Sequence, residues 1–201
     1  MGTCAEFMEI VSVRVIRPKN REAKALANVE ITFDTGITLL DMHLLRPREE
    51  GGDNYLRMPS IATKSGGFMD IYHPISKEAR QTMTEAANEA LRQAVEAGVN
   101  ELTVTFKEAS GRAPEFSDIK VHWFDNDKPV RAFASLLMDG EIVLNRLAVV
   151  RDVNTHMLAV RIPTHTFPRG KYRIGYYKIY GDAYDQLYSQ VMGAYADRTA
   201  S

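Results

Sequence analysis

Several polar residues whose types could do chemistry lie close together in residues 58–75, MPSIATKSGGFMDIYHPI. Asp70 and His73 suggest general-base catalysis, in which a carboxylate orients an imidazole. However, neither Ser60 nor any other nucleophile of this stretch has a suitable sequence context. A weaker copy of the stretch, residues 162–179, keeps neither Asp70 nor His73 when the two are aligned. We therefore predict that the chain is not an enzyme and has no catalytic residue.

Structural roles explain the same residues better. The Asp70 carboxylate is expected to accept hydrogen bonds from backbone N–H groups of the turn at Gly66-Gly67. His73 precedes a proline, which favours extended backbone, so His73-Pro74 is expected to hold the chain at the start of a helix. No phosphate-binding Lys-Ser/Thr pair follows the two glycines, so they indicate a turn rather than a phosphate loop.

The composition excludes several function classes. The 201 residues are 45% hydrophobic and 25% charged, with a net charge of -1, so any nucleic-acid binding must use local basic patches. The histidines and the single cysteine, Cys4, show no metal-site spacing, and we expect no metal and no cofactor. We expect no membrane span and no signal peptide, and a cytoplasmic location suits the lone cysteine. Residues 1–7 look like an upstream extension and are left out of the fold prediction.

Hydrophobic periodicity predicts strands followed by a helix. Apolar residues alternate with polar ones near residues 10–15, 25–33, 37–45 and 102–106, with short strands at 55–58 and 68–72. Residues 33–37 are expected to form a hairpin turn, with Gly36 able to take a positive φ. Small apolar residues at helical spacing predict a helix over residues 77–97, with Ser76 as its N-cap and Gly98 after its end.

The pattern then starts again after a polar segment, residues 108–115, so the chain contains an internal repeat. An offset of 105 brings Ile142, Leu144 and Arg151 onto Ile37, Leu39 and Arg46. After a one-residue loss in the loop at residues 152–155, an offset of 104 aligns the later positions: Arg161 with Arg57, Pro163 with Pro59, Gly170 with Gly66, Tyr176 with Tyr72, Ile179 with Ile75, Ala183 with Ala79 and Ala194 with Ala90. Asp139-Gly140 predicts a two-residue hairpin turn, and a second helix is expected over residues 182–197.

We therefore predict an α+β fold of two tandem units, each a small antiparallel β-sheet followed by a C-terminal α-helix. The first unit spans residues 8–107, the linker 108–115 and the second, degenerate unit 116–198. Units of this size are near the lower limit for a stable domain, so we expect them to pack as an intramolecular pseudo-dimer. A short strand at the edge of each sheet could pair with or exchange into the other unit. A further homo-oligomer is possible.

The first unit resembles the SpoVG family, the stage V sporulation protein G or septation regulators of bacteria. The family pattern runs roughly MPS-x-x-T-x-x-G-x-F-x-DI-x-HPI. The matching residues here are Met58, Pro59, Ser60, Thr63, Gly66, Phe68, Asp70, Ile71, His73, Pro74 and Ile75. The resemblance covers about residues 8–95. The second unit departs from the pattern, with Ile174, Tyr177 and Lys178 aligned to Asp70, His73 and Pro74, and the tandem arrangement is itself a departure from single-unit members.

This resemblance implies a nucleic-acid-binding protein, for DNA or RNA, that regulates gene expression, septation or sporulation. It implies neither catalysis nor a cofactor. Basic residues around the start and body of the helix would be the contacts, which here are Lys77, Arg80 and Arg92.

The clearest charged feature lies in the second unit. No acidic residue occurs between Asp152 and Asp182, while five cations do: Arg161, Arg169, Lys171, Arg173 and Lys178. Phe167, Tyr172, Tyr176 and Tyr177 are interleaved with them. Cations neutralise phosphates and rings stack on unpaired bases, so this stretch is a candidate nucleic-acid site. The alternative is that the tyrosines pack on the helix and the cations form a solvated sheet edge.

The first unit has a milder basic surplus. Arg57, Lys64, Lys77 and Arg80 outnumber the nearby Asp70 and Glu78. The predicted function is thus a nucleic-acid-binding regulator that uses these basic groups. The alternative is a non-enzymatic protein-interaction or scaffolding module that has lost nucleic-acid binding.

Overall fold

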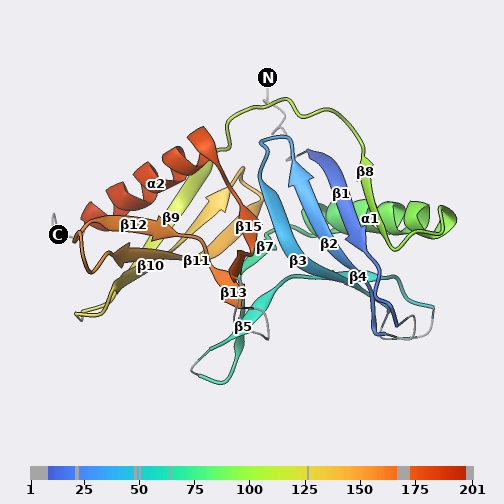
Figure 1. The fold of residues 1–201 in the computed structure, drawn as a ribbon, viewed down its shortest axis with the longest axis horizontal. Coiled ribbons are helices and arrows are strands. Elements are labelled where there is room, and N and C mark those ends of the chain that lie inside the picture. The colour runs from blue at the N-terminus through green and yellow to red at the C-terminus, as the bar shows by residue number, and fades with distance from the viewer. Residues whose placement is uncertain are drawn as a thin grey trace.

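The fold is described from a computed structural model that covers residues 9–20, 23–47, 49, 51–63, 65–125, 127–166 and 173–197. It contains two large antiparallel sheets, and one helix lies beside each of them (Figure 1). The chain is therefore α+β, as its sequence predicts.

The first sheet has the strand order β15-β3-β2-β1-β8, and β4 pairs with β3. Its strands are β1 (Ile10–Ile16), β2 (Ala25–Phe33), β3 (Thr38–Leu45), β4 (Tyr55–Arg57), β8 (Glu101–Thr105) and β15 (Tyr177–Lys178). Helix α1 (Lys77–Glu96) packs on β1 and β8. Every second residue of β1 is buried, which is the period that a sheet with one covered face requires.

The second sheet has the order β12-β11-β10-β9, and β7 pairs with β11. Its strands are β7 (Tyr72–Pro74), β9 (Phe116–Trp123), β10 (Val130–Met138), β11 (Ile142–Arg151) and β12 (Leu158–Arg161). Helix α2 (Gly181–Ala196) packs on β9 and β12. Two small hairpins complete the described fold: β5 (Ser60–Ala62) with β6 (Phe68–Asp70), and β13 (Thr164–Thr166) with β14 (Arg173–Gly175).

Local features of the sequence determine where α1 begins and which of its faces is buried. The Ser76 hydroxyl accepts a hydrogen bond from the Ala79 backbone N–H at 3.0 Å, so Ser76 is the predicted N-cap. The apolar stripe of α1 is buried through Met83, Ala87, Ala90 and Ala94. Three of these four are alanines, which lets the helix lie close to the sheet.

The hairpin turns have the backbone that their residues favour. Gly36 has φ 78° between β2 and β3, while Asp139 and Gly140 have φ 51° and 66° between β10 and β11. Two successive positive φ values are those of a type I′ turn, whose twist matches that of the flanking strands. Both predicted turns are confirmed.

The predicted strand at residues 68–72 is divided into two strands, because the chain changes partners at Ile71. Strand β6 ends at Asp70 and pairs with β5, whereas β7 begins at Tyr72 and pairs with β11 of the other large sheet. The Ile71 N–H donates to the Pro59 carbonyl at 2.8 Å, and its carbonyl accepts from the Asn145 N–H at 2.7 Å. Ile71 is 1% exposed, so this junction is anchored in the core.

Each large sheet receives a short strand from the far half of the chain. Strand β7 pairs Tyr72 with Leu144 of β11, and β15 pairs Tyr177 with Leu39 of β3. The two pairings are equivalent: adding 105 to the residue numbers of Tyr72 and Leu39 gives Tyr177 and Leu144. The expected exchange of edge strands is therefore present in the fold.

The same reciprocity corrects the sequence alignment in this region. The Leu40 N–H donates to the Tyr176 carbonyl at 2.9 Å, just as the Asn145 N–H donates to the Ile71 carbonyl. Tyr177, rather than Tyr176, therefore takes the place of Tyr72. The position that corresponds to His73 is Lys178, and not Tyr177 as the offset of 104 implied.

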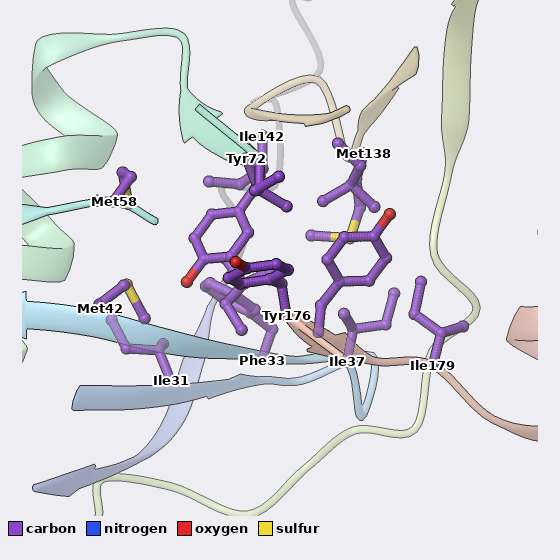
Figure 2. Close-up of a cluster of buried hydrophobic side chains, with 14 of the residues drawn as sticks. Ile31, Phe33, Ile37, Met42, Met58, Tyr72, Met138, Ile142, Tyr176 and Ile179 are labelled. Carbon is purple, nitrogen blue, oxygen red and sulfur yellow. The ribbon is translucent and has the colours of Figure 1, made fainter. Parts of the chain in front are cut away.

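One hydrophobic core joins both sheets and both helices. Figure 2 shows Phe33 and Ile37 of the first half facing Met138 and Ile142 of the second, with Tyr72 beside them. The Tyr72 and Tyr177 rings meet edge to face, with their centroids 6.4 Å apart. The aromatic contact between the exchanged strands thus lies inside the shared core.

Residues 108–115, the predicted linker, contain no helix or strand, and Arg112 anchors this segment to both halves. Its guanidinium donates to Asp34 Oδ2 at 2.9 Å and to Asp139 Oδ1 at 3.1 Å. These aspartates occupy the two hairpin turns and are themselves 105 residues apart. Burial opposes the guanidinium charge, but the hydrogen bonds to Asp139 and Asp34 outweigh it and raise the pKa of Arg112.

Candidate nucleic-acid interface

The basic stretch of the second half is divided between several elements. Arg161 is exposed at the end of β12, and Lys178 is exposed on β15. Arg173 begins β14, and only its backbone is described. Lys171 lies outside the described residues. Four further predicted or associated residues also lie outside them: Lys64, Phe167, Arg169 and Tyr172.

Tyr176 and Tyr177 are not the stacking surface that their spacing among cations suggested. They are 9% and 1% exposed, and burial raises the pKa of both phenols. The β15 pairing carries Tyr177 into the core beside Tyr72, while Lys178, the next residue, faces outward. These two rings therefore pack inside the protein, and Tyr177 does so against Tyr72 of the other half.

Lys77 and Arg80 line a groove of about 840 Å³ between α1 and the segment before β4. Both side chains are exposed, and the groove also receives Asp53 and Glu85. Asn54 Nδ2 donates to Asn88 Oδ1 at 2.8 Å, which ties the loop to the helix. The groove is polar and open, with charges of both signs.

Arg57 is exposed on β4, directly across the sheet from His43 of β3. Burial lowers the pKa of the His43 imidazole, Asp41 opposes this effect, and the Arg57 charge lowers it further. A neutral His43 beside Arg57 leaves that guanidinium charge available to a ligand.

Arg92 differs from the other helix cations because its charge is already paired. Its guanidinium contacts Glu89 at 2.6 Å and Glu96 at 2.5 Å. The hydrogen bond from Arg92 lowers the pKa of Glu89 to about 2. These acids lie at i−3 and i+4, so the pairing was already visible in the sequence. Arg92 is therefore a weak candidate for phosphate contact.

The polar residues of the 58–75 stretch are distributed over two sheets. Ser60 and Asp70 are cross-strand neighbours in the β5–β6 hairpin, while His73 sits in β7 against Val143. The turn is held by Thr63, whose hydroxyl accepts from the Gly67 N–H at 3.1 Å. At Asp70, the carbonyl rather than the carboxylate accepts from Asn145 Nδ2 at 2.9 Å. The expected role of the Asp70 carboxylate in the turn is thus taken by Thr63.

His73 has extended backbone just before α1, as expected, and it has a further role in the fold. Together with Pro74 it forms part of the exchanged strand β7, and its Nδ1 atom is buried with no hydrogen-bond partner among the described residues. Within the described ranges no group of His, Cys, Asp and Glu side chains could hold a metal ion. Neither α1 nor α2, the two helices of the described chain, is both long enough and apolar enough to cross a bilayer.

Comparison with known proteins identifies the first half of the chain. A family model described as SpoVG matches residues 8–93. A protein of Heliobacterium modesticaldum is 34% identical over 92 residues, which are 46% of this chain and 99% of that protein. One of Clostridioides difficile is 36% identical over 88 residues, 44% of this chain and 91% of its own length. Both carry the septation-protein name SpoVG. The chain belongs to the SpoVG family.

No solved structure matches the chain significantly. The SpoVG match runs from the start of β1 into the last turns of α1, so it includes the predicted contacts Arg57, Lys77 and Arg80. The basic stretch of residues 161–178 lies beyond it. The names of the SpoVG relatives refer to septation rather than to a reaction.

Sequence reasoning missed several residues that the structure brings together. Arg146 was not considered, although its guanidinium lies over the Phe133 ring, with Cζ 3.9 Å from the ring centroid. Arg146 lies on β11 and Phe133 on β10, so no local spacing indicates the arrangement. Arg112 was treated as part of a plain linker. Asp34 and Asp139 are 105 residues apart, which is the offset of the internal repeat. This was the one available signal that the two turns share a partner.

Proposed function

We propose that this SpoVG-family chain is a nucleic-acid-binding regulatory protein, acting on DNA or RNA in gene expression, septation or sporulation. The observation that carries the proposal is a set of exposed cations that form no ion pair with another described residue. They are Arg57, Lys77, Arg80, Arg161 and Lys178. Free guanidinium and ammonium groups neutralise phosphates and release the counterions bound to them.

The proposal includes the architecture of two related units, residues 8–107 and 116–198, packed as an intramolecular pseudo-dimer. Three reciprocal relations support it: the exchanged strands β7 and β15, the bulge residues Asp41 and Arg146 that share φ 64°, and the turn aspartates that share Arg112. In each of the three, the corresponding residues of the two halves are 105 positions apart in the sequence. Two sheets that each complete the other are what a duplicated dimer-forming unit would give.

The net charge of -1 determines the form that binding takes. Without a global positive field, association relies on the local cations and is strongly weakened by salt. The proposed protein works in the cytoplasm, without a cofactor and without catalysis.

The test reverses charge in the described helix-side group. Lys77→Glu combined with Arg80→Glu should weaken binding to labelled DNA and RNA, measured by fluorescence anisotropy over a salt series. The slope of log K against log salt should fall by about 0.9 for each lost contact with a duplex phosphate. A parallel pair, Lys171→Glu with Arg173→Glu, tests the basic stretch of the second half.

Arg151→Glu is the matched control, because Arg151 is exposed on β11 and belongs to neither basic group. It should leave the slope nearly unchanged. A slope equal to wild type in either charge-reversed pair removes that group from the interface.

A second candidate function is a protein-interaction module, and one observation favours it. Phe68, at the start of β6, is 79% exposed on a hairpin that stands out from both sheets (Figure 1). Aromatic residues, Phe among them, are enriched where two proteins contact each other. If the wild-type chain binds neither single-stranded nor double-stranded DNA or RNA at low salt, the interaction module is the better assignment.

A further inference from the structure

The face of the second sheet that is turned away from α2 carries rings and arginines together. Trp123 points toward α2, where its Nε1 donates to the Tyr195 carbonyl at 3.2 Å. His122, the neighbouring residue on β9, therefore faces the other way. The pairing register continues this row across the four strands as His122, Phe133, Ala148 and Arg161.

The rings on this open face are in contact with one another. His122 and Phe124 meet edge to face with centroids 5.2 Å apart, and Phe124 meets Phe133 in the same way at 5.3 Å. The Arg146 guanidinium covers the Phe133 ring, with its Cζ 3.9 Å from the centroid. A cation over a ring face is attracted to the ring and so keeps its position, and Arg146 is partly exposed and lines a groove.

A groove of about 600 Å³ lies on this face and reaches the β7 and β15 segments. Phe133, Arg146 and Arg161 line it, and Ile71 and Tyr176 form part of its wall. Among the described residues around it, two are cations and none is acidic. Its size and its mainly apolar wall suit one planar organic group with a negative charge attached.

Both arginines keep their charge available. Burial alone lowers the pKa of Arg146, and no carboxylate within the described chain forms an ion pair with it. Arg161 is exposed. The pKa of the nearby Asp152 carboxyl is lowered mainly by the hydrogen bond from the Thr155 backbone N–H, and the Arg161 charge contributes least. An anionic ligand would thus meet two cations without a competing carboxylate.

The Arg146 backbone is also unusual. Its φ of 64° is in the left-handed region, at a bulge where the β10–β11 register shifts. An arginine there costs more than an asparagine or a glycine, and such strain tends to persist where the side chain has a use. Arg146→Asn therefore removes the guanidinium and introduces a residue that tolerates the positive φ at this position.

We propose that this groove binds an unpaired nucleotide of single-stranded nucleic acid. Arg161 binds the phosphate, and the base stacks on the outer side of the Arg146 guanidinium, which Phe133 supports from beneath. Bases stack on guanidinium planes and aromatic rings only when their own faces are free, so a paired base in a duplex does not fit. The inference rests on the proposed function and adds to it the form of nucleic acid and the residues that recognise it.

The experiment compares Arg146→Asn and Arg161→Gln with Arg151→Gln, an exposed arginine of β11 that is absent from the groove lining. Each variant is titrated by fluorescence anisotropy with an unstructured oligothymidylate and with a mixed-sequence duplex. We expect the two groove variants to weaken single-strand binding by roughly 10-fold and to weaken duplex binding far less, since Arg161 is one of several cations that contact a duplex. Phe133→Leu, which removes the support beneath Arg146, should act in the same direction.

Three results would overturn the inference alone, with the proposed function intact. The groove variants bind the single strand as the Arg151 control does; they lose single-strand and duplex binding equally; or a free nucleoside monophosphate binds as tightly as the oligonucleotide. A wild-type chain that binds neither nucleic acid at low salt instead overturns the proposed function, and the inference with it.

Discussion

At the scale of single residues, the two buried tyrosines of the exchanged strands occupy equivalent places with different hydrogen bonding. The Tyr72 hydroxyl donates to the Leu40 carbonyl, whereas the Tyr177 hydroxyl is buried with no partner in the described chain. A buried polar group without a partner costs free energy, and a buried hydrogen bond that loses one member leaves such a group behind. The two positions therefore respond differently to the same change.

Tyr72→Phe should lower the free energy of unfolding by about 1–2 kcal/mol, because the Leu40 carbonyl loses its donor. Tyr177→Phe should leave it unchanged or raise it slightly, because it removes an unpaired hydroxyl from the core. Urea denaturation of both variants measures the difference. Equal losses in the two would contradict the assignment.

His43 should make stability depend on pH. Burial lowers the pKa of the folded imidazole below its ordinary 6.5, so the unfolded chain takes up a proton first as the pH falls. This contribution is fully present above pH 6.5 and is lost as the pH falls below it. Between about pH 7 and 5, His43→Gln should therefore lose less stability than the wild type in thermal unfolding. His156→Asn, at an exposed position, is the control and should follow the wild type.

At the scale of elements, the segment between β8 and β9 holds the two halves together through ion pairs and is more than a spacer. Arg112 joins the β2–β3 turn to the β10–β11 turn through carboxylates whose side chains are only 4% and 2% exposed. Ser110 adds a hydrogen bond from its hydroxyl to Asp34 Oδ2 at 3.2 Å. The position of the two hairpins thus depends on a segment with no regular structure.

Arg112→Met should destabilise the protein by about 3 kcal/mol, because it leaves two buried carboxylates without their cation. Denaturant unfolding measures the loss. Arg92→Met, which removes an arginine with exposed ion pairs, should change the midpoint little. Adding Asp34→Asn and Asp139→Asn to Arg112→Met should recover much of the loss; failure to recover would show that the charges are not its cause.

At the scale of the whole molecule, neither sheet is complete without the other half of the chain. Strands β7 and β15 cross between the halves (Figure 1), and their tyrosines, Tyr72 and Tyr177, meet edge to face in the common core. Unfolding one half would remove a strand from the other sheet and expose that core. The two halves should therefore be thermodynamically coupled.

We expect a single cooperative unfolding transition. Differential scanning calorimetry should give a calorimetric enthalpy equal to the van't Hoff enthalpy. Two separated transitions, or a van't Hoff enthalpy near half the calorimetric one, would mean that the halves unfold independently despite the exchanged strands.

The sequence by itself determined the features that depend on neighbouring residues. The alanine-rich stripe after Ser76 predicted α1, Asp139-Gly140 predicted a tight turn, and alternation predicted most strands of the first sheet. The pattern at residues 58–75 also identified the SpoVG family. In each case the cause acts over a few residues, through a cap, a favoured φ or a repeated period.

Only the tertiary structure decided which surfaces those elements present. Tyr176 and Tyr177 alternate with cations in the sequence, but strand exchange buries both rings. The residues now proposed to hold a nucleotide, Phe133, Arg146 and Arg161, come from three strands and meet only through the pairing register. Register depends on contacts between distant segments, and a shift of one residue would turn each side chain to the opposite face. For that reason the spacing of residues along the chain could not reveal this groove.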